Sequence, residues 1–153
     1  MRSAAGPRGR GRGQSTTLQY TLTLAVATLV VTGLFVAAGD LVTSEREQVI
    51  RTELEVVGQQ LAGELTAADR LVRSSEGTEA LAINASLPPE VTGAGYTVAI
   101  SDDGTDQWVN LTTASPDVSV SVRVDTGTDL ADASVQGGDL SIVYDGSALE
   151  VRS

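Results

Sequence analysis

The sequence predicts an α+β protein whose long N-terminal helix packs on a small antiparallel β-sheet head, with a membrane-spanning first half and an amphipathic second half. Three observations predict it: an uncharged apolar run up to residue 39, an apolar stripe of helical period after it, and strand-like alternation in the C-terminal half. The expected organisation is a basic leader (1–13), a transmembrane helix (14–39), an amphipathic extracellular helix (40–77) and a β-rich extracellular head (78–153).

The leader is short, polar and basic. Its charges are Arg2, Arg8, Arg10 and Arg12, and three of these precede Gly. Arg-Gly repeats occur in disordered segments that bind RNA. Here the repeat is brief and adjoins an apolar run, which favours a topological role for the charges, and we expect no nucleic-acid partner.

The apolar run contains no charge between Arg12 and Asp40. About 20 mostly apolar residues suffice for a helix to cross the hydrocarbon core of a bilayer. The threonines within the run are tolerated, because a helical Thr hydroxyl can bond a carbonyl of the preceding turn. A helix that is apolar all round must be buried in a large core or in a membrane. Since the chain has too little other material to wrap it, the run predicts a membrane span.

The charges on the two sides of this run orient it. Basic residues precede it, whereas Asp40, Glu45 and Glu47 follow it with Arg46 as the only nearby positive charge. Positive charge is retained on the cytoplasmic side of a membrane. The sequence therefore predicts a single-pass protein of the cell membrane with a cytoplasmic N-terminus and an extracellular C-terminal domain.

From residue 40 to about 73 the pattern is that of an amphipathic helix. Apolar residues recur every three or four positions, at Ile50, Leu54, Val57, Leu61, Leu65, Ala68 and Val72. We expect this stripe to cover the sheet of the head. Gly58 and Gly63 each cost about 1 kcal/mol relative to Ala, so they would permit a bend in the helix.

The rest of the chain predicts about five antiparallel strands. Residues 96–100 and 108–112 flank the turn Asp103-Gly104-Thr105-Asp106. A four-residue loop there pairs Ile100 with Val109 and keeps one face apolar, whereas a five-residue loop pairs Ile100 with Trp108 and mixes the faces. The four-residue loop is preferred.

Three further strands are predicted after this hairpin. Residues 118–124 alternate Val with polar side chains, and residues 140–144 and 147–151 flank Asp145-Gly146. Asp-Gly favours a two-residue type I′ turn. Such a turn would pair Ile142 with Leu149, leaving one face of the sheet on the helix and the other in solvent.

Composition argues against enzymatic chemistry. The chain has no His, no Cys and no Lys, so the commonest general base, thiol chemistry and Ser/Lys pairs are all missing. The acidic segment 102–106 could hold Ca²⁺, but it lacks EF-hand spacing, and Asp-Gly is ordinary turn chemistry. We expect no catalytic residues, no metal site and no cofactor.

The charge balance is strongly acidic. Removing the four leader arginines from the ten basic residues leaves six Arg against 20 Asp and Glu, a formal charge of −14. Such self-repulsion is largely screened at molar salt, where the Debye length is about 3 Å. The acidic, Lys-free composition indicates a halophilic source, with an ordinary acidic secreted protein as the alternative.

The junction Arg12-Gly13-Gln14-Ser15 resembles the class III leader of archaeal type IV pilins and archaellin-like proteins. The resemblance implies that a prepilin-type peptidase cuts between Gly13 and Gln14. It also implies a subunit or minor component of a pilus-like surface filament or its assembly machinery, with other pilin-like subunits or assembly proteins as partners. One departure is Leu18, at the fifth mature position, where bacterial pilins usually carry Glu.

Two other interpretations are open. The chain could stay in the bilayer as an anchored extracytoplasmic domain of structural or binding role. It could instead be a secreted binding module cut after Ala38, although secretory apolar regions of about 7–15 residues are shorter than this one. The outward topology would also make a glycoprotein possible, since Asn84, in an expected loop, and Asn110, on an expected outward strand face, both begin Asn-X-Ser/Thr sequons.

Overall fold

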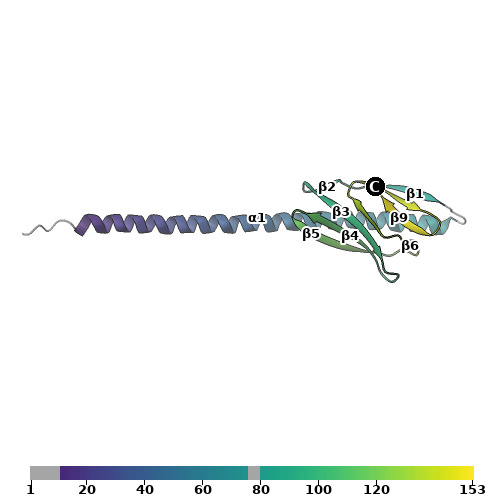
Figure 1. Ribbon diagram of the computed structural model, residues 1–153, viewed down its shortest axis with the longest axis horizontal. Helices are drawn as coiled ribbons and strands as arrows, with labels where there is room; N and C mark the ends of the chain where they lie inside the picture. Colours follow the sequence, from purple (N-terminus) through teal and green to yellow (C-terminus); the bar gives the residue numbers. More distant parts are fainter. Residues whose placement is uncertain (1–10, 76–79) are drawn as a thin grey trace, which may run out of the picture. The chain divides into compact units, whose positions relative to one another are not determined.

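The computed structural model describes residues 11–75 and 80–153, and the side chains of residues 17–75 and 80–153. It confirms the α+β fold, with one long helix at the N-terminal end followed by antiparallel sheets (Figure 1). By its contacts the chain divides into two compact units, with the division between Ser44 and Glu45. The first ten residues of the expected leader lie outside the described residues.

Helix α1 spans Gly11–Ser74, so the apolar run and the amphipathic stripe belong to one continuous helix. Thr hydroxyls in the apolar run bond the carbonyl four residues earlier: Thr21 to Thr17, Thr23 to Gln19, Thr28 to Leu24 and Thr32 to Thr28, at 2.8–2.9 Å. The expectation that these threonines satisfy themselves within the helix is confirmed.

The second unit contains the rest of α1 and, among the described residues, nine strands. These are β1 (Leu81–Ser86), β2 (Glu90–Val91), β3 (Ala94–Asp102), β4 (Gln107–Ala114), β5 (Asp117–Val124), β6 (Asp129–Leu130), β7 (Ala133–Gln136), β8 (Asp139–Tyr144) and β9 (Ala148–Arg152). One sheet has the order β1-β8-β9-β6; the other has the order β2-β3-β4-β5, with β7 also paired to β3.

The strand count and the single sheet predicted from sequence were therefore wrong. The five predicted strands are present, but β1 occupies a segment expected to be a loop, and β2, β6 and β7 are too short to show a period in sequence. The two-residue β6 also pairs in parallel with β9, whereas the other ladders are antiparallel.

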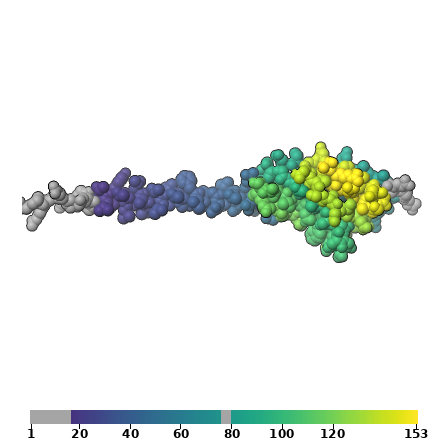
Figure 2. Space-filling view, in the orientation of Figure 1, coloured from purple at the N-terminus to yellow at the C-terminus, as the bar shows by residue number. Residues whose placement is uncertain are grey.

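The stripe of α1 forms the centre of the core. Ile50, Leu54, Leu61, Leu65 and Ala68 are fully buried, and they cluster with the inward side chains of both sheets. Strand β5 supplies Val118, Val120, Val122 and Val124, which alternate with exposed residues as the sequence predicts. Figure 2 shows how the strands cover this part of the helix.

Gly58 permits the close approach of the helix to the sheet. A Cβ at this position would lie 2.7 Å from Cγ2 of Val122 and 2.9 Å from Cδ1 of Leu111. Gly63, on the same helix, has nothing within 4 Å of the equivalent point. The two glycines, which the sequence alone does not distinguish, therefore have different roles. Only at Gly58 does the packing of α1 on the sheet leave no room for a side chain.

The β3–β4 register agrees with the preferred prediction. Val98 pairs with Leu111, Ile100 with Val109, and Asp102 with Gln107. The side chain of Asp103 caps the four-residue loop by accepting from the N–H groups of Thr105 and Asp106 at 2.9 and 2.7 Å.

The β8–β9 register differs from the prediction. Ile142 pairs with Val151 and Tyr144 with Leu149, so the two-residue turn is wrong. The cause is Asp145, whose Oδ1 accepts from Ser147 N, Ser147 Oγ and Ala148 N within 3.0 Å and closes a longer loop. These bonds lower the pKa of Asp145 to about 2. Because the shift is two residues, each side chain stays on its predicted face.

Candidate functional site: an unburied apolar helix and the surface of the head

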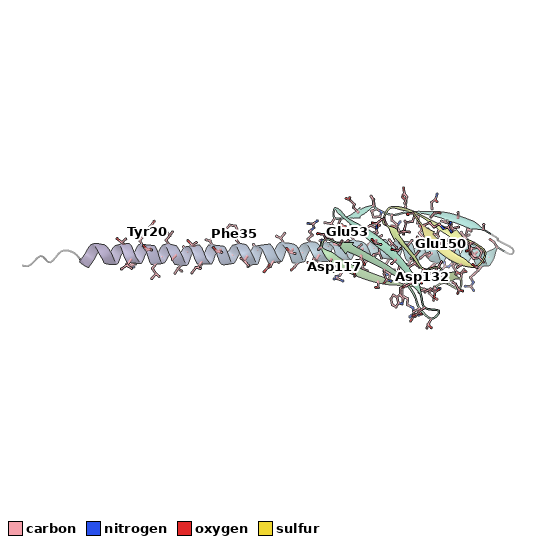
Figure 3. All side chains as sticks on the ribbon, viewed as in Figure 1. Tyr20, Phe35, Glu53, Asp117, Asp132 and Glu150 are labelled. Atoms are coloured by element: carbon pink, nitrogen blue, oxygen red, sulfur yellow. The ribbon has the colours of Figure 1, made fainter. Side chains whose placement is uncertain are left out.

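The apolar half of α1 is the most unusual surface of the protein. An 18-residue window has a mean hydropathy of 2.2, and none of it is buried. In the described part of the chain it is the one helix long and apolar enough to cross a membrane. Tyr20 and Phe35 project from it, 72 % and 74 % exposed (Figure 3).

A soluble domain buries its core helix, whereas no residue of this apolar window is buried. Leu18, Leu22, Leu29 and Leu34 are all more than 60 % exposed. Monomeric soluble proteins rarely expose continuous apolar patches larger than a few hundred Å². A single apolar helix of this length is compatible with a single-pass membrane anchor.

The expected processing site lies at the start of α1. The helix begins at Gly11, so Gly13 and Gln14 fall in its first turns, while their side chains lie outside the described ones. Cleavage between them stays a prediction. The alternative cleavage region, residues 36–39, lies inside the continuous helix.

The two sequons have different surroundings. Asn84 is on β1 rather than in a loop, and its side chain is exposed. Asn110 is on β4, between β3 and β5, and its half-buried amide is held by two serines.

The acidic segment at the end of β3 is a hydrogen-bonded turn. Asp102 accepts from the N–H groups of Leu130 and Gly104 and from the Gln107 amide, at 2.8–3.0 Å. These bonds, led by that of Leu130, lower the pKa of the Asp102 carboxyl. Its oxygens thus hold backbone and amide donors. The described residues include no group of three or more His, Cys, Asp or Glu that could hold a metal ion.

Sequence reasoning missed a buried carboxylate on α1. Asp69 is 3 % exposed and accepts from the N–H and the hydroxyl of Thr128 at 2.9 and 2.7 Å, with Arg73 3.6 Å away. Burial alone would raise its pKa, but the bonds from Thr128 and Gly127 together with Arg73 outweigh burial, and the pKa is lowered. Asp69 fastens the 126–128 loop to the helix. In the sequence, the sign that this side chain is buried is its position next to Ala68, which belongs to the apolar stripe of α1.

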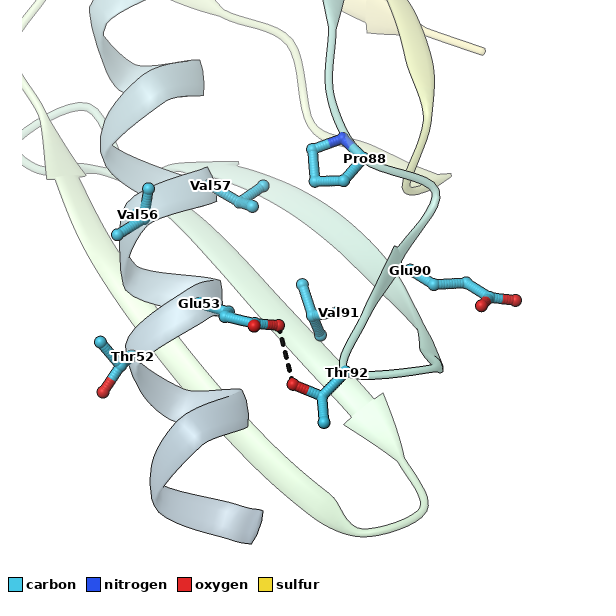
Figure 4. Close-up of a pocket in the computed structure, with 8 residues that line it drawn as sticks. All are labelled: Thr52, Glu53, Val56, Val57, Pro88, Glu90, Val91 and Thr92. Carbon is cyan, nitrogen blue, oxygen red and sulfur yellow. Dashed lines mark hydrogen bonds between the residues drawn. The ribbon is translucent and has the colours of Figure 1, made fainter. Parts of the chain in front are cut away.

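A hollow of about 440 Å³ lies between α1 and the β2 hairpin (Figure 4). Glu53 accepts a 2.9 Å hydrogen bond from the hydroxyl of Thr92, whose positive φ of 49° places it in a tight turn with Gly93. Val56, off the buried stripe, stays 63 % exposed beside it. The residues that line the hollow are Thr52, Glu53, Val56, Val57, Pro88, Glu90, Val91 and Thr92.

These observations define a class: a β-rich head built around the second half of a helix whose first half is apolar and unburied. The chain belongs to the DUF7266 family, a family of unknown function, whose model matches residues 9–152. No curated protein matches the chain significantly. No solved structure does so either.

Proposed function

We propose that this protein is a pilin-like surface protein, a structural subunit or minor component of a filament or of its assembly machinery. The observation that carries the proposal is the continuity of α1. One helix presents an apolar, uncovered half and then supplies the buried stripe of a β-rich head. That arrangement suits a protein whose apolar half-helix contacts lipid or the helices of other subunits while its head stays in water.

The proposed topology places the N-terminus in the cytoplasm and the head outside the cell. The four arginines of the leader and the acidic residues after position 39 support it through the positive-inside rule. The proposed partners are the membrane, a prepilin-type peptidase that cuts between Gly13 and Gln14, and other pilin-like subunits or assembly proteins.

A structural role is proposed rather than an enzymatic one. The support comes from composition, since the sequence has no His, Cys or Lys to activate its many serines.

The experiment that tests the proposal is the mass of the mature protein from its native host. We expect an N-terminus at Gln14 and a Gly13→Leu variant that retains the leader. A wild-type protein that keeps its leader would replace the pilin-like proposal with the anchored domain. An N-terminus at Gly39 would replace it with the secreted module.

We extend the proposal to a halophilic setting because the chain beyond the leader is strongly acidic. Without the four leader arginines, six of the ten basic residues remain against 20 acidic ones, a formal charge of −14. Screening at molar salt should relieve repulsion among exposed carboxylates. The unfolding midpoint of the head should therefore rise between dilute buffer and molar salt. A midpoint independent of salt would remove the halophilic part of the proposal alone.

A further inference from the structure

We propose that Asn84, and not Asn110, is the N-glycosylated residue of this protein. Both begin sequons of equal standing in the sequence, Asn84-Ala85-Ser86 and Asn110-Leu111-Thr112. The distinction comes from their places in the two sheets, and the inference rests on the proposed outward topology of the head.

Strand β1 forms one edge of its sheet. Its residues pair with β8 on one side, and no described strand pairs with the other. An edge strand keeps unpaired backbone groups that another chain can approach. A transferase that binds an extended acceptor therefore reaches Asn84 by opening a single ladder.

The side chain of Asn84 is also free to react. It is exposed, and among the described residues no hydrogen bond engages its amide. Its cross-strand neighbour is Ser141, and its neighbours on the same face of β1 are Ala82 and Ser86. All three are small, so a bulky group on Nδ2 meets no large side chain among them.

The surface beside Asn84 suits a sugar. A hollow of about 430 Å³ adjoins it, lined in part by Ser86, Asp139, Ser141 and Ser153. The Ser86 hydroxyl donates to Asp139 Oδ1 at 2.6 Å, which leaves acceptor capacity on both groups. These oxygen atoms can accept hydrogen bonds from the hydroxyl groups of an attached sugar.

Asn110 has the opposite environment. Strand β4 is paired along both sides, with β3 and with β5. The half-buried amide donates from Nδ2 to Ser101 Oγ at 3.3 Å and accepts from Ser121 Oγ at 2.7 Å. Glycosylation there would require opening two ladders and would disturb the hydrogen bond that Nδ2 donates to Ser101.

The chemical step requires a lipid-phosphate-linked oligosaccharide as donor. Nδ2 of Asn84 forms a bond to the anomeric carbon of the first sugar while the bond from that carbon to the phosphate oxygen breaks. The amide nitrogen loses one proton to a base of the transferase, and the lipid phosphate leaves with the electron pair. No change of oxidation state occurs.

The test is intact-mass and peptide analysis of the full chain purified from its native host, with four variants. We expect added sugar mass on the peptide that contains Asn84 and its complete loss in Asn84→Gln and Ser86→Ala. Ser86→Thr keeps the sequon hydroxyl and should restore the mass, and Asn110→Gln should leave it unchanged. Fluorescence of Trp108, the only Trp, reports whether each variant has folded.

Added mass that survives Asn84→Gln, or that maps to Asn110, would overturn the inference. So would a wild-type protein with no added mass. The same spectra give the N-terminus, which separates this inference from the proposed function. A chain that starts at Gln14 without sugar overturns only the inference, whereas a glycosylated chain with its leader intact overturns only the cleavage.

Discussion

The two halves of helix α1 differ both in how apolar they are and in what covers them. In residues 17–44 every side chain is exposed, including Leu29 at 73 %. In residues 45–74 the stripe is buried, with Leu61 at 0 %. The more apolar half is therefore the one whose side chains are exposed. The difference teaches that folding covers the apolar stripe of the second half and leaves the first half exposed. On the proposed function, lipid surrounds the first half and water surrounds the head, which we call the two-solvent account.

Truncation of one leucine in each half gives the largest expected contrast. Leu61→Ala removes a fully buried side chain and should lower the free energy of unfolding of the head by about 2–5 kcal/mol. Leu29→Ala should change it by less than about 0.5 kcal/mol, because that side chain is 73 % exposed and lies outside the core of the head. Urea titration in detergent micelles, followed by Trp108 fluorescence, measures both. Equal effects would mean that the two halves are covered alike.

The buried carboxylate of the second half should give a pH-dependent effect. Asp69→Asn weakens the charge-assisted bonds from Thr128 and should cost about 1–3 kcal/mol at neutral pH. The pKa of folded Asp69 lies below its ordinary 3.8, so the stabilisation is complete above that value and is lost as the pH falls through the lower, folded pKa.

The difference between wild type and Asp69→Asn should accordingly shrink as urea titrations are repeated toward acid. Glu64→Gln is the matched control, since it removes a charge from the same helix at a side chain that bonds no described residue. A difference that is constant with pH, or an equal one for the control, would show that the Asp69 charge is not what holds the 126–128 loop.

The two glycines of the second half should respond in opposite directions. Gly58→Ala places a methyl group 2.7 Å from Val122 and should destabilise by about 1–3 kcal/mol, less the roughly 1 kcal/mol that Ala gains in a helix. Gly63→Ala meets nothing within 4 Å and should stabilise by up to about 1 kcal/mol. Thermal unfolding of both variants checks the signs. Stabilisation by Gly58→Ala would contradict the close packing of α1 on β5.

Sequence predicted the elements whose apolar pattern is long enough to show a period. The stripe from Ile50 to Ala68 and the alternation of β5 are both present as expected. The β3–β4 register was predictable because only one loop length keeps its apolar face whole. The β8–β9 register was not, because a two-residue shift preserves the faces and the deciding bonds come from the side chain of Asp145.

The candidate sites were predictable only where they depend on local sequence. The apolar run and both sequons are visible in the chain itself. The hydrogen bonds from Thr128 to Asp69 and from Thr92 to Glu53 join residues 59 and 39 positions apart in the sequence. No local sequence pattern predicts such distant pairs. The contrast between Asn84 and Asn110 likewise depends on sheet order, which places one at an edge and the other between two strands.

The most direct test of the two-solvent account is the labelling of single cysteines in intact cells with a membrane-impermeant maleimide. The chain has no Cys, so each substitution gives one signal. Leu29→Cys and Val56→Cys replace side chains of similar exposure in the folded protein, 73 % and 63 %. The account predicts fast labelling of Val56→Cys from outside and none of Leu29→Cys. Equal labelling of the two, or labelling of Val56→Cys only after the membrane is opened, would contradict it.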